Sequence, residues 1–135
     1  MAPQTSLPAP DAPVSVFLVE DSPLIRERLE RMLESVSGTR TIGHAESADD
    51  AIREILAAHP DVVVLDYQLA DGTGFDVLRA IHRDSPQTDV YMLTSFPTEP
   101  YRRLAERLGA REFFDKSTEF ERVRDALAAR VQTAH

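Results

Sequence analysis

The chain has 135 residues, no cysteine and a formal net charge of −8 at pH 7. This length fits one domain whose core is large enough to be stable without cross-links. The absence of cysteine excludes disulfides, thiolate metal sites and a cysteine nucleophile, and the negative charge argues against nucleic acid as the main partner.

Residues 1–13 are rich in proline and lack the basic start and the apolar core of a signal peptide. We expect them to form a disordered, partly extended tail. The domain is predicted over residues 14–132, with 133–135 as its C-terminal end. No apolar stretch is long enough to cross a bilayer, so we expect no membrane partner. The absence of cysteine fits a reducing, cytoplasmic setting.

From residue 14 onward, short apolar runs alternate with amphipathic segments. The runs are rich in β-branched residues and predict buried strands over residues 14–19, 41–45, 62–66, 89–93 and 112–114. In the segments between and after them, apolar residues recur at helical spacing, which predicts five helices. Residues 69–74 are rich in turn formers, and we interpret them as the turn before the third helix.

The expected helices carry recognisable end signals. Helix starts are indicated at Ser22-Pro23, at Ser47 with Asp50 (which resembles a capping box), at Thr98 and at Glu119. Helix ends are indicated at Gly38, His59-Pro60, Gly109 and about Val131. Strands that alternate with helices in this way predict an α/β fold, with a parallel sheet covered by helices on both faces.

Polar side chains follow four of the five predicted strands. Glu20-Asp21 follow the first, Asp66 ends the third, Thr94-Ser95 follow the fourth, and Asp115-Lys116 follow the fifth. Because the carboxyl ends of parallel strands share one edge, we expect these groups to meet there. Clustered acids repel one another unless a cation neutralises them, and oxygen ligands alone suit Mg²⁺. A carboxylate beside a metal, a hydroxyl and an ammonium is equipped to accept a phosphoryl group.

With these residues in this order, the chain from about Val14 to Val131 resembles a bacterial response-regulator receiver domain. The matching positions are Glu20-Asp21, Asp66, Thr94 and Lys116, together with the aromatic Phe113 three residues before the lysine. The resemblance implies a flavodoxin-like (βα)5 fold, a three-layer sandwich with strand order 2-1-3-4-5. It also implies phosphorylation by a sensor histidine kinase or a phosphotransfer protein, and a role in two-component signalling.

The resemblance assigns a role to each matching residue. Asp66 would be the phosphoacceptor, and Lys116 and Thr94 would hold phosphoryl oxygens. Mg²⁺ would be bound by Glu20, Asp21, Asp66 and the backbone carbonyl of Gln68. Thr94 and Phe113 would form the switch that relays phosphorylation to the surface of the fourth helix, fifth strand and fifth helix.

Some positions depart from the family's usual pattern. Ala70 and Ser117 stand where proline is common, which predicts a less rigid loop after Asp66 and calls into question the cis peptide bond after Lys116. The resemblance implies that Gln68 and Phe96, two residues after Asp66 and Thr94, face the direction from which water attacks the phosphoryl group. We expect the phosphorylated form to be long-lived because Phe96 shields it.

The chain ends directly after the last predicted helix, so we expect a stand-alone receiver without an output domain, which is not an enzyme. Its output would be a downstream protein target, with a phosphorylation-dependent homodimer as a further option. Arginines gather between residues 102 and 130, and we interpret them as a solvated surface balanced by glutamates, not as a nucleic-acid site. Three alternatives stay open: a receiver excised from a longer regulator, a constitutive interaction module that is never phosphorylated, and a phosphohydrolase with a transient aspartyl phosphate.

Overall fold

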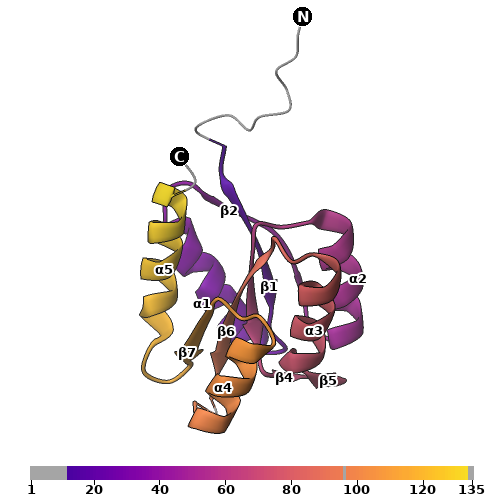
Figure 1. The fold of residues 1–135 in the computed structure, drawn as a ribbon. Helices are drawn as coiled ribbons and strands as arrows, with labels where there is room; N and C mark the ends of the chain where they lie inside the picture. Colours follow the sequence, from indigo (N-terminus) through magenta and orange to yellow (C-terminus); the bar gives the residue numbers. More distant parts are fainter. Residues whose placement is uncertain (1–11, 96, 134–135) are drawn as a thin grey trace, which may run out of the picture.

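The computed structural model of the chain describes residues 12–95 and 97–133, which form a parallel sheet between two layers of helices (Figure 1). The strands of this sheet are β1 (Val14–Val19), β2 (Thr39–Ala45), β3 (Val62–Asp66), β6 (Asp89–Thr94) and β7 (Glu112–Asp115). The helices are α1 (Pro23–Glu34), α2 (Ala48–Ala58), α3 (Gly74–Asp84), α4 (Glu99–Arg107) and α5 (Phe120–Thr133). The short strands β4 (Gln68–Leu69) and β5 (Gly72–Thr73) form a separate antiparallel hairpin.

The sheet has the strand order β2-β1-β3-β6-β7. With the small hairpin set aside, this is the predicted order 2-1-3-4-5, and the α/β flavodoxin-like fold is confirmed. The order reverses between β1 and β3, and open parallel sheets bind ligands beyond the carboxyl ends of the strands at such a point. Residues 1–11 of the predicted tail and residues 134–135 lie outside the described residues.

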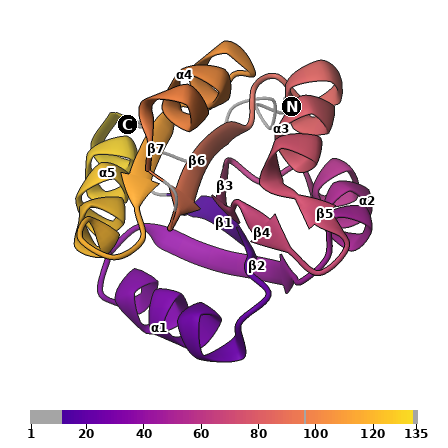
Figure 2. The ribbon, with the colours of Figure 1, turned by 90° about the horizontal axis from the view of Figure 1, so that it is seen from below.

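Each face of the sheet is covered by its own helices, as the view onto the strand ends shows (Figure 2). Helices α2, α3 and α4 pack on one face, and α1 and α5 pack on the other. Strand β3 lies in the middle of the sheet, and all of its residues are buried, which explains its unbroken apolar run. Its side chains alternate between the two cores, so that Val63 and Leu65 join the first and Val62 and Val64 the second.

Local capping explains where the helices begin and end. Ser22 accepts a hydrogen bond from the backbone N–H of Ile25 at 3.3 Å, and Pro23 follows at the first helical position. The predicted capping box of α2 is only half formed. Ser47 accepts from Asp50 N–H at 3.2 Å, but the Asp50 carboxylate pairs with Arg53 at 2.6 Å instead of returning to the cap.

Residues 69–74, predicted to be a plain turn, contain most of the β4–β5 hairpin, and this correction has a physical reason. Strands of two residues are too short to produce an alternating pattern in the sequence. At the hairpin turn the Asp71 carboxylate accepts hydrogen bonds from the backbone N–H groups of Ala48 and Asp49. The hairpin therefore caps α2 from outside that helix.

Edge strand β2 is irregular where it pairs with β1. Val16 faces Thr41 and Phe17 faces Gly43, so that Ile42 is an extra residue with no partner in the register. This is the two-against-one arrangement of a β-bulge. The strand is also longer than predicted, since it begins at Thr39 and not at residue 41.

Candidate functional site

Two adjacent strands bring three carboxylates together at the carboxyl edge of the sheet. Glu20 and Asp21 directly follow β1, and Asp66 is the last residue of β3, which pairs with β1. One carboxylate oxygen from each residue lies within 4.8 Å of the others. Glu20 is only 1% exposed and Asp66 5% exposed, whereas Asp21 is open to solvent.

Lys116 provides the positive charge of this cluster. Its Nζ lies 2.9 Å from Glu20 Oε1 and 3.2 Å from Asp66 Oδ1, and it donates a hydrogen bond to Glu20 Oε2 at 3.2 Å. The lysine is positioned by its own backbone, because its N–H donates to the Thr94 carbonyl at 2.8 Å. The lysine therefore has two acidic partners, Asp66 and Glu20.

Burial and charge set the protonation of Glu20, Asp66 and Lys116. Burial, together with repulsion from Asp66, outweighs the attraction of Lys116 and raises the pKa of Glu20 from 4.5 to about 7. Burial also raises the pKa of Asp66, although Lys116 opposes the rise. Burial lowers the pKa of Lys116, but the hydrogen bond to Glu20 and the attraction of Asp66 outweigh this effect, so the pKa of the lysine is raised. The single positive charge of Lys116 therefore does not fully compensate for the burial of the Glu20 and Asp66 carboxylates.

The cluster fits a small divalent cation. Glu20 Oε1 is buried and has no hydrogen-bond donor, since its close contact with Lys116 is an ion pair without hydrogen-bond geometry. An additional cation would satisfy this oxygen and would offset the repulsion from Asp66, which adds to the effect of burial on the pKa of Glu20. The set contains only carboxylate oxygens, which suits Mg²⁺ or Ca²⁺ better than a softer metal. Gln68, whose backbone carbonyl is a predicted ligand, lies in β4, two residues after Asp66.

The predicted switch residues lie on β6 and β7, the two strands that follow β3 in the sheet. Thr94 ends β6 and is 2% exposed; Phe113 lies in β7 and is 7% exposed. Arg102 of α4 stacks on the Phe113 ring, with its guanidinium carbon 4.7 Å from the ring centre, and donates a hydrogen bond to the Phe113 carbonyl at 3.4 Å. This stacking was not predicted from the sequence. Phe96, predicted to shield the phosphoryl group, lies outside the described residues.

Close backbone packing supports the Asp66 end of the site. The N–H of Gly74 donates to the Tyr67 carbonyl at 2.6 Å. A Cβ atom on Gly74 would overlap the carbonyl oxygen of Asp66. Glycine is therefore required at position 74, because the Asp66 backbone comes too close to leave room for a side chain. From the sequence, this segment was predicted only to be a turn.

Residues 16–128 match the family described as the response regulator receiver domain. The chain belongs to this family. Receiver domains are the signal-receiving modules of two-component systems; they bind Mg²⁺ at an acidic pocket and interact with histidine kinases and downstream targets.

Relatives of this receiver domain occur in several bacteria. The chain is 28% identical over 114 residues to response regulator UvrY of Escherichia coli, covering 84% of this chain and 52% of the relative. It is 33% identical over 111 residues to a protein-glutamate methylesterase/protein-glutamine glutaminase of Anaeromyxobacter dehalogenans, covering 82% and 32%. The receiver domain thus spans about half or less of these curated relatives. A receiver domain is in general not an enzyme.

A solved structure agrees with the fold. The signal receiver domain of the putative LuxO repressor protein from Vibrio parahaemolyticus is 26% identical, with a TM-score of 0.81 over 90% of this chain and 92% of that chain. None of the helices in residues 12–95 and 97–133 has the length and apolar character needed to cross a membrane.

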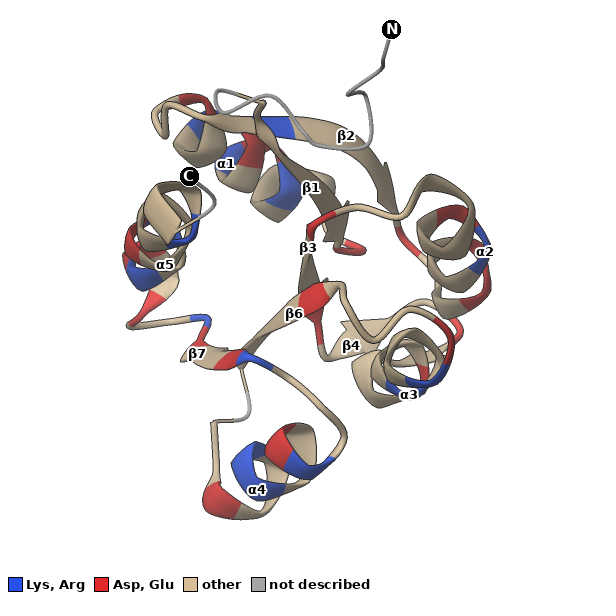
Figure 3. Ribbon diagram, turned by 45° about the horizontal axis from the view of Figure 1, so that its top comes forward, with Lys and Arg blue, Asp and Glu red and all other residues tan. Residues whose placement is uncertain are grey.

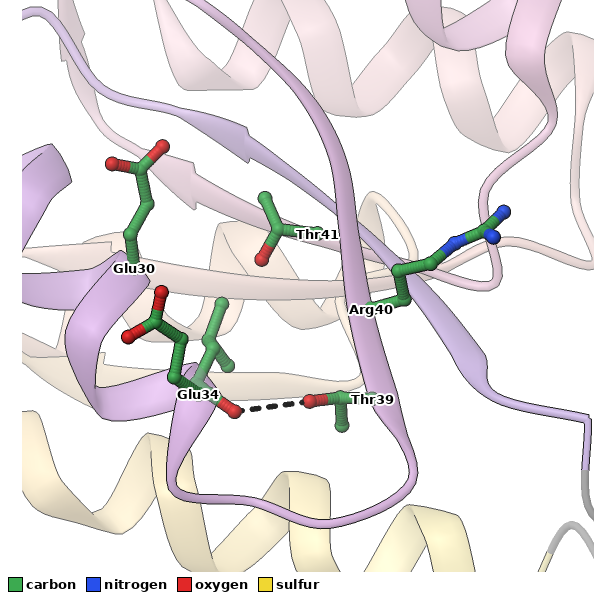
Figure 4. Close-up of a pocket in the computed structure, with 6 residues that line it drawn as sticks. Glu30, Glu34, Thr39, Arg40 and Thr41 are labelled. Atoms are coloured by element: carbon green, nitrogen blue, oxygen red, sulfur yellow. Dashed lines mark hydrogen bonds between the residues drawn. The ribbon is translucent and has the colours of Figure 1, made fainter.

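Other features of this receiver domain lie away from the acidic cluster. A hollow of about 510 Å³ opens between α1 and the start of β2, where Glu30 and Glu34 lie on one side of the strand and Arg40 points to the other (Figure 4). No residue of the acidic cluster lines it. Acidic and basic residues alternate along α4 and α5 (Figure 3), with ion pairs such as Arg122–Glu119 at 2.7 Å. This mixture agrees with the predicted solvated surface.

Proposed function

We propose that this receiver domain is a phosphorylation-controlled switch, with Asp66 as phosphoacceptor and Mg²⁺ as cofactor. The observation that carries the proposal is the arrangement of buried Asp66 and Glu20 with partly buried Lys116, beside exposed Asp21. A structural acid at a strand end would not need two more carboxylates and a lysine around it. The raised pKa of Glu20, caused first by burial and then by Asp66, supports a site built for an additional cation.

Each residue of the site would have its own role in phosphoryl transfer. An Asp66 carboxylate oxygen forms a bond to phosphorus as the bond between phosphorus and the donor's histidine nitrogen breaks. Glu20, Asp21, Asp66 and the Gln68 carbonyl would hold Mg²⁺, which when bound offsets charge on the phosphoryl oxygens and orients the group. Lys116, already 3.2 Å from Asp66, would transfer its ion pair to a phosphoryl oxygen. The Thr94 hydroxyl would donate a hydrogen bond to another.

The phosphoryl group would then bias a two-state surface. Thr94 and Phe113 are the proposed relay, and the surface of α4, β7 and α5 is the proposed contact for a downstream protein or a second copy. The proposed donor is a sensor histidine kinase or a phosphotransfer protein. Gln68, which is exposed, and Phe96 are proposed to set the lifetime of the phosphorylated form. A cytoplasmic location is proposed as well.

Incubation with acetyl phosphate and Mg²⁺, followed by intact mass measurement, tests the proposal. We expect the mass of one phosphoryl group on the native chain and none on Asp66→Asn. Asp115→Asn is the matched control, because Asp115 ends β7 at the same edge of the sheet but lies outside the carboxylate cluster; it should gain the same mass as the native chain. Label on Asp66→Asn would place the acceptor elsewhere.

The alternatives give different results in the same experiment. A constitutive interaction module would gain no mass and would show no spectral change with beryllofluoride. A phosphohydrolase would turn over a phosphomonoester steadily, without accumulating phosphorylated protein. Phosphotransfer from a panel of histidine kinases would then identify the donor, again with Asp66→Asn as control.

A further inference from the structure

Three aromatic rings join the segment after Asp66 to helix α4. The Tyr67 ring makes edge-to-face contacts with Phe75 at 5.1 Å and with Tyr101 of α4 at 5.2 Å between ring centres. The rings of Phe75 and Tyr101 stack at 6.1 Å. The hydroxyl groups of Tyr67 and Tyr101 also share a hydrogen bond. The two tyrosines are thus connected by both ring packing and a polar contact.

Tyr67 interacts with the side chain of Asp66 in addition to following it in the chain. Its backbone N–H donates a hydrogen bond to the Asp66 carboxylate. Its carbonyl accepts from Gly74 at 2.6 Å, which fixes the peptide at the start of α3. A change in the partners of the Asp66 carboxylate therefore acts directly on the peptide that carries the Tyr67 ring.

Helix α4 is attached to the domain by few side chains. Among its residues only Ala105 is fully buried, and Tyr101 and Leu104 are partly buried against the same core. The next residue after Tyr101, Arg102, stacks on Phe113 of β7. Two neighbouring residues of α4 thus contact two different parts of the site. Tyr101 contacts the segment after Asp66, and Arg102 contacts the predicted switch residue Phe113.

We propose that the Tyr67–Tyr101 pair is a direct link between the phosphoacceptor and α4, separate from the route through Thr94 and Phe113. This inference rests on the proposed function, because it assigns a task to the pair only when Asp66 changes state. When Asp66 is modified, its hydrogen bond to Tyr67 N–H is redistributed, the ring shifts, and the contacts with Tyr101 move α4. Tyr67 and Tyr101 are positioning residues that act through the backbone of the site.

The tyrosine content of the chain allows a specific test. It has three tyrosines and no tryptophan, so fluorotyrosine labelling gives one fluorine NMR signal for each of Tyr67, Tyr91 and Tyr101. Tyr91 is an internal reference, because it is buried in the opposite core and pairs with Phe114 at 6.3 Å. The probe is beryllofluoride with Mg²⁺, which mimics a phosphoryl group on a carboxylate.

We expect the probe to shift the Tyr101 signal in the native chain and to leave Tyr91 nearly unchanged. In Tyr67→Leu most of the Tyr101 shift should be lost, because the ring contact that carries the change to α4 is removed. Phe113→Leu, which interrupts the other route, should retain most of it. Tyr67→Phe keeps the ring and should give an intermediate shift, which guards against a Leu variant that folds poorly; thermal melts by circular dichroism check folding.

An unchanged Tyr101 shift in Tyr67→Leu, or its loss in Phe113→Leu alone, would overturn the direct link while leaving the proposed function intact. Failure of the native chain to bind beryllofluoride, seen as no bound fluorine signal, would overturn both. The two failures are therefore distinguishable in one set of spectra.

Discussion

Glu20→Gln should stabilise the metal-free protein at alkaline pH. Glu20 has a pKa of about 7 in the folded chain and an ordinary value of 4.5 when unfolded. Below pH 4.5 the side chain is neutral in both states. As the pH rises towards 7 the unfolded chain loses this proton first, which favours unfolding, and above pH 7 the full penalty remains. Since a tenfold change in proton affinity corresponds to about 1.4 kcal/mol, this penalty is about 3 kcal/mol.

The assay is urea denaturation followed by far-ultraviolet circular dichroism, with a chelator present, at pH 5 and at pH 8. At pH 8 we expect Glu20→Gln to unfold with a free energy up to about 3 kcal/mol higher than the native chain. At pH 5 most of the difference should disappear. Glu27→Gln is the control, because Glu27 is exposed on α1 and its substitution should change little at either pH. A Glu20→Gln variant that is less stable than the native chain at pH 8 would refute the argument that burial, together with repulsion from Asp66, penalises the ionised form of Glu20.

Three further predictions are tested by thermal or urea unfolding. Mg²⁺ should raise the unfolding temperature more at pH 8 than at pH 6, because Glu20 must lose its proton to bind the ion. Asp21→Asn should weaken this effect of Mg²⁺. Equal increases in unfolding temperature at both pH values would contradict the prediction. Gly74→Ala should cost about 1–3 kcal/mol in urea, because the new Cβ overlaps the Asp66 carbonyl. Gly72→Ala should cost less, because its Cβ would meet the end of the Asp76 side chain and would touch Ala48 only at an ordinary contact distance. Asp71→Ala should lower the urea midpoint at neutral pH, because Asp71 caps α2. Hydrogen bonds from Ala48 and Asp49 lower the pKa of Asp71 below 3.8. The difference in midpoint between the variant and the native chain should therefore fade as the pH drops through the lowered pKa.

The sequence predicted the strands well, because each is an apolar run bounded by turn residues. Strands β1 and β3 have the predicted bounds, and β2 differs by two residues at its start. The hairpin β4–β5 was missed because its strands have two residues each. The Asp71 cap on α2 was missed for a different reason: donor and acceptor are 22 or 23 residues apart, and local patterns do not report such contacts.

The candidate site was predictable in its residues but not in its contacts. Strand ends identified Glu20, Asp66 and Lys116, because parallel strands deliver their ends to one edge. That Lys116 pairs with Glu20 depends on side-chain geometry between residues 96 positions apart. The same holds for the stacking of Arg102 on Phe113 and for the contact of Tyr67 with Tyr101. Each requires the relative placement of α4 and the sheet, which periodicity alone does not fix.

The bulge in β2 affects how the domain can associate with other chains. An exposed sheet edge can pair with a strand of another molecule, and proteins discourage this with irregular backbone and charged side chains. Here the extra residue Ile42 makes the backbone of the edge strand irregular, and Arg40 is exposed close to it. At the opposite edge, β7 has only four residues, two of them acidic. Neither edge favours the strand-to-strand contacts that lead to aggregation, which leaves the helical faces as the more favourable surfaces for specific, reversible association.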